Sequence, residues 1–237
     1  EVGESNKPMS AGEVRAAFAV YDGMMVTLGD AITADILQDF GRPRCRMVAN
    51  FGVGYNHIDV AACADHGVIV SNTPGAVTDA TADIALTLML MTARRAGEGE
   101  RMVRSGKWEG WHPTQLLGLH LTGKTVGVVG MGRIGQAIAR RCHFGFGMNV
   151  LYANRSEKTV DFPAVQKPLV EVAAAADVLV VAAPGGVETE HLIDAAVLEA
   201  MPKTAILVNI ARGNIVDERA LAAALESGSI AGAGLDV

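Results

Sequence analysis

The chain has 237 residues, half of them apolar, and carries a formal net charge of −6 at pH 7. A chain of this length can bury a sizeable core and is expected to form one large domain or two smaller ones. Because it contains no block of basic residues, neither nucleic acid nor an anionic membrane surface is expected as a partner.

Three cysteines, Cys45, Cys63 and Cys142, are scattered along the chain without the spacing of metal ligands, and no metal site is predicted. Their odd number favours reduced, buried thiols in a cytoplasmic protein. The longest apolar run, Ile84–Met91, is too short to span a bilayer. We therefore expect a soluble, cytoplasmic enzyme.

The first third of the chain alternates short apolar strands with helices. Residues Glu1–Ser10 are polar and expected to fray, and Val14–Tyr21 is the next apolar stretch. The predicted strands are Met24–Leu28, Arg46–Asn50 and Val68–Ser71, and we expect the first of them to be buried. The predicted helices are Thr33–Phe40 and His57–His66. Thr33 can cap the first helix, and Pro43 prevents that helix from continuing. Short connections between these elements predict a parallel sheet covered by helices.

A long helix, Ala80–Arg95, is predicted next, with Thr78 or Asp79 as its cap. Its apolar residues surround the helix axis, so we expect it to be buried on most sides as an interdomain or intersubunit helix. The polar segment Glu98–Gly110 follows. Trp108–Pro113 is expected to be a loop whose two large apolar side chains pack within the chain or against a second copy.

From Thr125 the alternation of strands and helices begins again. The predicted strands are Thr125–Val129, Asn149–Tyr152, Val178–Ala182, Ala205–Asn209 and Ala231–Leu235, and the predicted helices include Gln136–His143, Asp194–Ala200 and Asp217–Ser227, with Asp217 as an N-cap. Two α/β units thus flank the long helix, which predicts two domains with a cleft between them.

Three glycines at the end of the Thr125–Val129 strand have the spacing G-x-G-x-x-G, and a helix follows them. Gly130 would permit a sharp turn, Gly132 would let the backbone approach a pyrophosphate, and Gly135 would let the helix pack against its strand. Unpaired N–H groups at the start of that helix would face the phosphates. This context predicts dinucleotide binding, and a structural turn between strand and helix is the alternative.

The end of the next strand indicates which dinucleotide binds. In NAD-specific domains an acidic residue about 20 positions beyond the glycines accepts both ribose hydroxyl groups. Asn154 stands at that position here, followed by Arg155 and Ser156. A carboxylate would repel a 2′-phosphate, whereas arginine neutralises it and serine donates a hydrogen bond. We therefore predict a preference for NADP(H), with NAD(H) possible as well; the alternative is that Arg155 is only a solvated loop charge.

Six motifs in register resemble one family. They are Asn50–Asp59, Ser71–Gly75, Thr81–Asp83, Gly130–Gly135, Val208–Gly213 and Val216–Glu218. Together they resemble the D-isomer-specific 2-hydroxyacid dehydrogenases, most closely the glyoxylate/hydroxypyruvate reductases. The resemblance implies an α/β protein with a flavodoxin-like substrate domain, residues 1–76, and a doubly wound Rossmann domain, residues 77–237, which includes the 80–95 helix. It also implies reduction of a small 2-oxo acid by the nicotinamide.

The resemblance assigns roles to residues that match the motifs. Arg212 is expected to hold the substrate carboxylate and polarise the carbonyl group, because a guanidinium can grip a carboxylate with two hydrogen bonds; a surface ion pair is the alternative. The N–H groups of Val53 and Gly54 are expected to bind the same carboxylate, unless their loop is only a turn that needs positive φ. Thr78 is expected near the nicotinamide or as a helix cap, and Asp236 at the carboxamide or as another cap.

The remaining cofactor contacts follow from the same resemblance. Arg133 and Ile134 belong to the glycine motif, and Ala183 and Pro184 end a strand on the cofactor side. Ile210 is expected to lie against the nicotinamide ring, with core packing as the competing explanation.

The family's proton-transfer pair, a histidine and a glutamate, lies beyond the Gly-Leu-Asp-Val stretch with which this chain ends at Val237. We expect a shortened chain, mainly at its C-terminal end, that binds cofactor weakly and does not turn over. The family also implies a homodimer through the 80–95 helix and the Trp108–Trp111 loop. The alternatives are another D-2-hydroxyacid dehydrogenase, of phosphoglycerate or phosphite type, and a non-catalytic protein that senses NAD(P).

Overall fold

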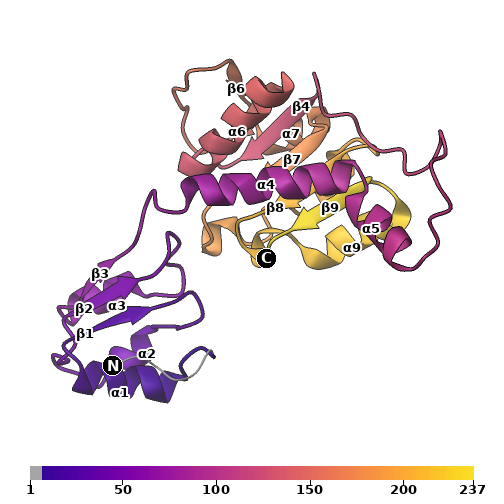
Figure 1. Ribbon diagram of the computed structural model, residues 1–237. Coiled ribbons are helices and arrows are strands. Elements are labelled where there is room, and N and C mark those ends of the chain that lie inside the picture. The colour runs from indigo at the N-terminus through magenta and orange to yellow at the C-terminus, as the bar shows by residue number, and fades with distance from the viewer. Residues whose placement is uncertain (1–6) are drawn as a thin grey trace. The chain divides into compact units, whose positions relative to one another are not determined.

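A computed structural model describes residues 7–237, and most of the segment expected to fray, Glu1–Ser10, lies outside them. The chain divides into two compact units between Val77 and Thr78, one residue from the boundary expected from the sequence. Each unit is an α/β structure with a parallel sheet, so the predicted fold class is confirmed (Figure 1). Among the described residues, no helix combines the length and the apolar character needed to cross a bilayer.

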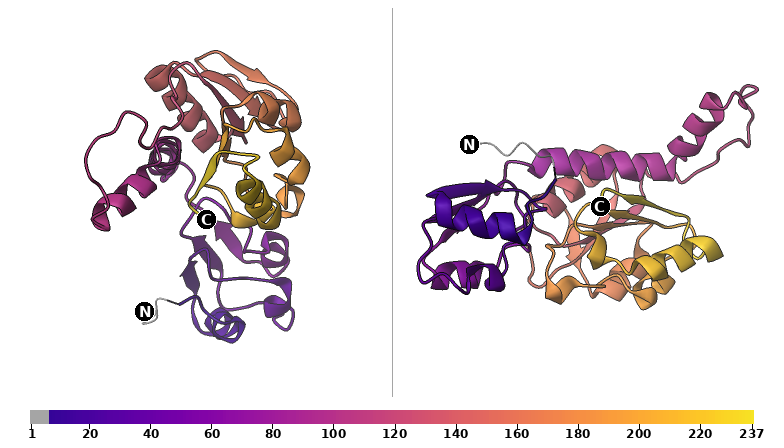
Figure 2. Two further views of the ribbon diagram at one scale, coloured as in Figure 1. Left: turned by 90° about the vertical axis from the view of Figure 1, so that its right-hand side faces the viewer. Right: turned by 90° about the horizontal axis from the view of Figure 1, so that it is seen from below.

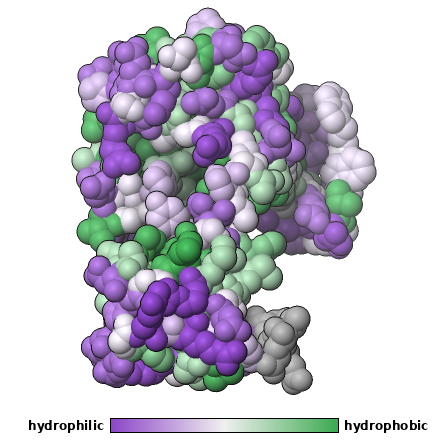
Figure 3. Space-filling view, turned by 90° about the vertical axis from the view of Figure 1, so that its left-hand side faces the viewer, coloured by the Kyte–Doolittle hydropathy of each residue, from purple (hydrophilic) through white to green (hydrophobic). Residues whose placement is uncertain are grey.

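The N-terminal unit contains a three-stranded parallel sheet in the order β1-β2-β3. Its elements are α1 (Ala11–Val20), β1 (Gly23–Val26), α2 (Ala34–Leu37), β2 (Met47–Asn50), α3 (Val60–Asp65) and β3 (Ile69–Ser71). Val26 and Val48 face a core that they share with the helices. Met25, Met47 and Ile69 point to the other face of the sheet and are exposed, so apolar side chains reach the surface of this unit (Figure 3).

Several predicted elements of this unit were wrong in their bounds or burial. The strand predicted as buried over Met24–Leu28 ends at Val26, its one buried residue, because alternate side chains reach the open face. The helix predicted through Phe40 ends at Leu37, and Thr33 makes no capping hydrogen bond with its side chain. The helix predicted from His57 begins at Val60 instead, because the carboxylate of Asp59 accepts the N–H of Ala62 and caps it.

The C-terminal unit contains a six-stranded parallel sheet in the order β6-β5-β4-β7-β8-β9. Its strands are β4 (Thr125–Val129), β5 (Asn149–Ala153), β6 (Ala164–Gln166), β7 (Val178–Val181), β8 (Ile206–Asn209) and β9 (Gly232–Leu235). Numbered within the unit, this is the order 3-2-1-4-5-6 of a doubly wound dinucleotide-binding sheet. The five strands predicted for this unit are confirmed to within one residue, while β6 was not predicted.

Helices cover both faces of this sheet. The helices are α4 (Thr78–Ala93), α5 (Ala96–Arg104), α6 (Arg133–Phe146), α7 (Leu169–Ala175), α8 (Ala195–Ala200) and α9 (Glu218–Ser227). Val126 and Val128 of β4 share a core with α4 and α6, whereas Val129 shares one with α7 and α8. Asp217 accepts the N–H groups of Arg219 and Ala220, so the predicted cap of α9 is confirmed.

Helix α4 differs from its prediction at its start. It begins at Thr78, so Thr78 and Asp79 lie in its first turn rather than at the cap. Its buried residues are Ala82, Ala85, Leu86, Met89 and Ala93. Ile84, Leu90 and Met91 are exposed in the single chain, so their burial against a second copy stays a prediction. Apolar residues surround the axis of α4, but the sheet covers only one side of it.

The segment after α4 also differs from its prediction. Residues predicted as a polar stretch continue as the helix α5, and Figure 2 shows α5 and the following loop extending away from the sheet of their unit. Trp108 is 53% exposed and Trp111 is 79% exposed. The two tryptophans are therefore not packed within this unit.

The three cysteines are free and buried, as predicted. Burial raises the pKa of Cys142 to about 12 and that of Cys63 to about 11. Because the thiolate is the nucleophilic form, these two side chains are unreactive packing groups.

Candidate functional site

One edge of the six-stranded sheet carries most of the predicted cofactor residues. Gly130 follows β4, Asn154 follows β5, Ala183 lies two residues beyond β7, Arg212 comes soon after β8, and Asp236 follows β9. Since all six strands are parallel, their carboxyl ends lie on the same edge. The strand order reverses between β4 and β7, and ligands of such sheets bind at this switch point.

The three glycines have three different surroundings. Gly130 has φ +94°, and a Cβ atom there would lie 2.6 Å from the backbone of Ala183. A Cβ atom at Gly135 would lie 2.1 Å from the carbonyl oxygen of Gly130. A Cβ atom at Gly132 would meet nothing within 4 Å. Gly130 and Gly135 are therefore required by the fold, whereas Gly132 leaves open space at the turn.

Helix α6 begins directly at this open space. Gly132 is its N-cap residue and has no side chain to accept an N–H, and the helical hydrogen bonds start with Gln136 N–H to the Gly132 carbonyl oxygen, 2.9 Å. The first N–H groups, those of Arg133, Ile134 and Gly135, thus have no partner inside the helix. Arg133 is exposed and Ile134 is half-buried. Such a helix start suits the phosphate groups of a dinucleotide.

The amide of Asn154 lies against the glycine turn. Its Oδ1 accepts the N–H of Met131 at 3.1 Å, and its Nδ2 donates to the carbonyl oxygen of Ser156 at 2.7 Å. An aspartate could accept the first hydrogen bond but could not donate the second. Asn154 therefore shapes both the turn and the loop that carries Arg155 and Ser156.

The side chain of Arg155 forms an ion pair with Glu188, 3.1 Å between Nη1 and Oε2. Glu188 belongs to the short helix η1 (Val187–Thr189), which follows β7. Both side chains are more than 80% exposed. An exposed ion pair of this kind contributes at most about 1 kcal/mol, so the guanidinium can exchange this partner for another anion at little cost.

The loop after β8 is held by a buried asparagine. Asn209 donates from Nδ2 to the carbonyl oxygen of Arg212 at 2.9 Å and accepts the N–H of Ala211 at Oδ1, 3.0 Å. Its own carbonyl oxygen accepts the N–H of Asp236 at 2.9 Å. Asn209 thus joins the two loops that carry Arg212 and Asp236. The sequence motif contains Asn209, but sequence reasoning assigned it no role.

Arg212 itself is half-buried, and its Nη1 donates to the carbonyl oxygen of Ala211 at 2.6 Å. Ile210 is 7% exposed and packs in the same core cluster as α4, which agrees with the packing alternative for this residue. Thr78 is half-buried and Pro184 is exposed. The cofactor contacts of these residues stay predictions.

In the N-terminal unit, two asparagines hold the predicted carboxylate loop. Asn50 is 2% exposed, and its Nδ2 donates to the carbonyl oxygens of Gly52 at 3.0 Å and Gly54 at 2.9 Å. Asn72 donates from Nδ2 to the carbonyl oxygen of Val53 at 2.8 Å. The three carbonyl groups of the loop are therefore all held by side chains of the same unit.

This arrangement leaves the N–H groups of the loop available. Within residues 7–237, the N–H groups of Val53 and Gly54 form no hydrogen bond. Neither Gly52 nor Gly54 has a positive φ, so a strained turn does not account for these glycines. Two adjacent N–H groups without hydrogen bonds can together donate to a carboxylate. Asn50 is a residue that sequence reasoning missed, although an asparagine ending a buried strand before Gly-x-Gly is a usable signal.

Three histidines have structural partners. His57 Nε2 lies 3.1 Å from Asn50 Oδ1, which must accept because the amide nitrogen of Asn50 donates twice. His66 Nδ1 lies 2.8 Å from the Ala62 carbonyl oxygen, and His143 Nδ1 lies 3.2 Å from that of Met148.

Comparison with known proteins identifies the family to which the chain is similar. Residues 86–237 match the model of the NAD-binding domain of D-isomer specific 2-hydroxyacid dehydrogenases. A glyoxylate reductase from Pyrococcus horikoshii is 46% identical over 223 residues, which are 91% of this chain and 66% of that protein. The chain therefore spans about two thirds of the length of this relative.

Two solved structures superpose on most of the chain. An NADPH-dependent glyoxylate/hydroxypyruvate reductase from Sinorhizobium meliloti, in complex with NADP and malonate, has a TM-score of 0.85 and 40% identity, covering 96% of this chain and 70% of that one. A D-lactate dehydrogenase from Aquifex aeolicus, complexed with NAD and lactic acid, has a TM-score of 0.86 and 28% identity, covering 94% and 66%.

Two alanine substitutions should separate folding from nucleotide binding. Gly132→Ala adds a methyl group to open space, so the chain should keep its thermal stability. If the pyrophosphate binds at this turn as predicted, the methyl group would occupy its path and the Kd for the dinucleotide should rise about tenfold or more. Gly135→Ala pushes a methyl group into the Gly130 carbonyl and should destabilise the unit by about 2 kcal/mol or more. Thermal melts and fluorescence titration measure both effects. Unchanged nucleotide binding by Gly132→Ala would contradict the assigned role.

Proposed function

Since the chain belongs to the D-isomer-specific 2-hydroxyacid dehydrogenase family, we propose that its protein reduces a small 2-oxo acid, glyoxylate or hydroxypyruvate, to the D-2-hydroxy acid. The observation that carries this proposal is that the chain contains two features, one in each unit. One is the open glycine turn at the switch point of a dinucleotide-binding sheet, and the other is the pair of free N–H groups at Val53 and Gly54. The relatives support it, because two of them are named as reductases of glyoxylate.

The bound nicotinamide supplies the hydride from its C4 atom. The start of α6 binds the pyrophosphate through its free N–H groups, which fixes the cofactor along the edge of the sheet. The N–H groups of Val53 and Gly54 and the guanidinium of Arg212 bind the substrate carboxylate. Arg212 also polarises the carbonyl group, and holding the substrate at two points orients the carbonyl carbon for hydride transfer.

Further contacts to the cofactor are part of the same proposal. Thr78 would lie near the nicotinamide, Ile210 would contact its ring, and Asp236 would accept a hydrogen bond from the carboxamide. Ala183 and Pro184 border the cofactor where β7 ends. Four of these residues follow strands of the six-stranded sheet and lie at its carboxyl edge, which agrees with these roles: Ala183, Pro184, Ile210 and Asp236.

The cofactor is NADP(H) in preference to NAD(H) in this proposal. Asn154 lacks the negative charge that would repel a 2′-phosphate, Arg155 offers an exposed guanidinium, and Ser156 offers a hydroxyl group. One similar structure holds NADP and another holds NAD, so the relatives are compatible with either cofactor. The argument for NADP(H) rests on the charge of the loop after β5.

Two other functions are candidates. One is a non-catalytic sensor of NAD(P), and the other is a dehydrogenase of the phosphoglycerate or phosphite type. The free N–H pair in the N-terminal unit favours a reductase, because a sensor needs no site for a substrate carboxylate. One substrate panel separates these candidates.

The panel measures oxidation of NADPH and NADH with glyoxylate, hydroxypyruvate, pyruvate and 3-phosphohydroxypyruvate, and reduction of NAD(P) with phosphite. It uses the full-length gene product, because the chain spans about two thirds of its relative. We expect the highest kcat/KM with glyoxylate or hydroxypyruvate, and a loss of about 100-fold or more in Arg212→Gln. Cofactor binding without turnover of any substrate would favour the sensor instead.

Arg155→Ala tests the cofactor preference. Loss of the charge-assisted contact to the 2′-phosphate should raise KM for NADPH about tenfold and change KM for NADH less than about twofold. Glu188→Gln is the matched control, since it breaks the same ion pair but leaves the guanidinium in place, and it should leave KM for NADPH unchanged or lower it. Equal effects of Arg155→Ala on both cofactors would reject the assignment.

We also propose a homodimer that covers the exposed apolar side of α4 and the Trp108–Trp111 loop. Ile84 and Met91 are each more than 40% exposed on α4. Ile84→Glu combined with Met91→Glu should therefore convert a dimer to a monomer in size-exclusion chromatography with light scattering. Leu225→Glu, at a similarly exposed apolar position on α9, is the control and should leave the mass unchanged. A monomeric wild-type protein would argue against this interface.

A further inference from the structure

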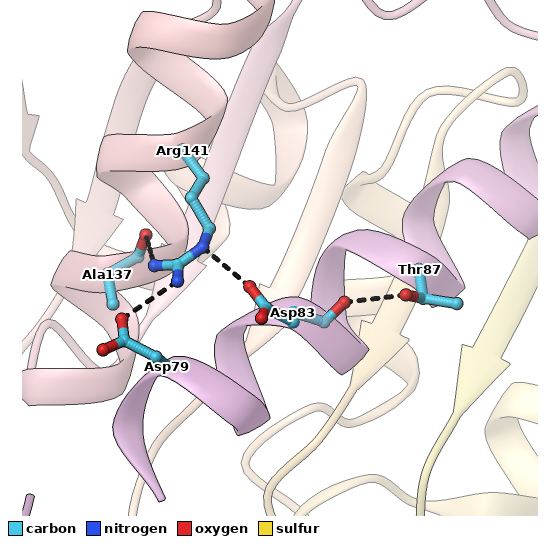
Figure 4. Close-up of polar contacts among 5 residues, drawn as sticks. All are labelled: Asp79, Asp83, Thr87, Ala137 and Arg141. Atoms are coloured by element: carbon cyan, nitrogen blue, oxygen red, sulfur yellow. Dashed lines mark hydrogen bonds and ion pairs between the residues drawn. The ribbon is translucent and has the colours of Figure 1, made fainter.

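Two carboxylates and one guanidinium join the first turns of α4 to the middle of α6. Arg141 donates from Nη2 to Oδ1 of Asp79 at 2.9 Å and from Nε to Oδ1 of Asp83 at 3.0 Å. Its Nη1 donates to the carbonyl oxygen of Ala137 at 3.2 Å. Figure 4 shows the guanidinium between the two carboxylates. All three nitrogens of the guanidinium therefore have partners, which fixes its orientation.

Asp79 and Asp83 would repel each other without this arginine. They are four residues apart on one helix, where like charges are neighbours and destabilise the helix. Arg141 is only 31% exposed, so water screens its charge less than that of a fully exposed side chain. Its hydrogen bond to Asp79 raises the pKa of Arg141 above the ordinary value of an arginine.

The first turn of α4 has little packing to hold it. Its residues, Thr78–Thr81, are half-buried or exposed, and the first buried residue of the helix is Ala82. From Ala82 onward the helix packs on the sheet, where Gly234 of β9 lies so close that a Cβ atom would be 2.9 Å from Thr92 Oγ1. The later turns are thus fixed by close packing, whereas the first turn is tied to α6 by ion pairs.

The first turn of α4 lies at the junction of the two units in the sequence. It opens the C-terminal unit directly after the connection from the N-terminal unit, which ends at Val77. It also carries Thr78. Helix α6, to which Arg141 ties the turn, is the helix that begins at the glycine turn.

We propose that Arg141 is a positioning residue for the cofactor site, holding the first turn of α4, and with it Thr78, in a fixed place relative to α6. The inference rests on the proposed contact of Thr78 with the nicotinamide. Arg141 touches neither cofactor nor substrate and acts through the helix that it holds. Loss of the guanidinium loosens the first turn and weakens the grip on the nicotinamide half of the cofactor, while the phosphate site on α6 stays intact.

The variant Arg141→Met, made in the full-length gene product, removes the guanidinium and keeps an unbranched apolar side chain. Arg140→Met is the matched control, because Arg140 is the neighbouring residue on the same helix and pairs with the exposed Asp161 instead of with α4. Thermal melts of both variants establish that each one folds.

Hydrogen exchange measures the order of the first turn. The N–H groups of Ala82–Ala85 bond to the carbonyl oxygens of Thr78–Thr81, so they lose protection when that turn opens. We expect about tenfold faster exchange of these groups in Arg141→Met, since two ion pairs are lost and two like charges remain. Arg140→Met should exchange like the wild type. Adding Asp83→Asn to Arg141→Met removes the repulsion and should restore part of the protection.

Two ligands separate positioning from general damage. NADPH carries the nicotinamide, whereas 2′-phospho-ADP-ribose has the same phosphate half without it. In Arg141→Met we expect Kd for NADPH to rise about threefold or more and Kd for 2′-phospho-ADP-ribose to stay the same, because the α6 site is unchanged.

The exchange and binding measurements test separate parts of the proposal. Unchanged exchange of Ala82–Ala85 in Arg141→Met would overturn the anchoring role. Faster exchange with equal effects on the two ligands would overturn the link to the nicotinamide. If the wild-type full-length gene product binds neither ligand, the proposed function fails, and the exchange measurement still decides whether Arg141 orders the turn.

Discussion

Direct contact between backbones at the end of β4 is the constraint on which the cofactor unit depends. The turn at Gly130 lies against Ala183 beyond β7, and α6 at Gly135 lies against the carbonyl group of Gly130. No side chain fits between these segments, so two strands and one helix are held in a single arrangement. The free N–H groups at the start of α6 consequently lie at the point where the strand order reverses.

Asparagines serve the same purpose at three strand ends. Asn50 is the last residue of β2, Asn209 is the last residue of β8, and Asn154 follows β5. Each amide accepts one hydrogen bond, and each donates into the loop that follows it, Asn50 twice and the other two once. An aspartate of the same shape has no donor, and a leucine has neither a donor nor an acceptor. These loops are thus held by neutral groups, which add no negative charge where anionic ligands are proposed to bind.

Sequence patterns were sufficient where one local rule decides the structure. The buried strands β4, β7 and β8, the turn at Gly130 and the cap of α9 by Asp217 follow from apolar runs, glycine spacing and capping chemistry. The exposed side of α4 could not be predicted, because the sequence of an apolar helix does not show whether the side facing away from the sheet is covered or exposed. The role of Arg141 depends on partners brought together by the fold, 58 and 62 residues away in the sequence, so a local pattern does not contain it.

The exposed loop after α5 has a spectroscopic consequence. Both tryptophans of the chain, Trp108 and Trp111, lie in it and are exposed within their unit. Intrinsic indole emission therefore reports the polarity around this one loop and is insensitive to the cores of the two sheets. Burial of the loop shifts the emission to shorter wavelength, whereas unfolding of either core barely changes its colour. For the proposed dimer, tryptophan fluorescence would thus report association rather than folding of the two sheets.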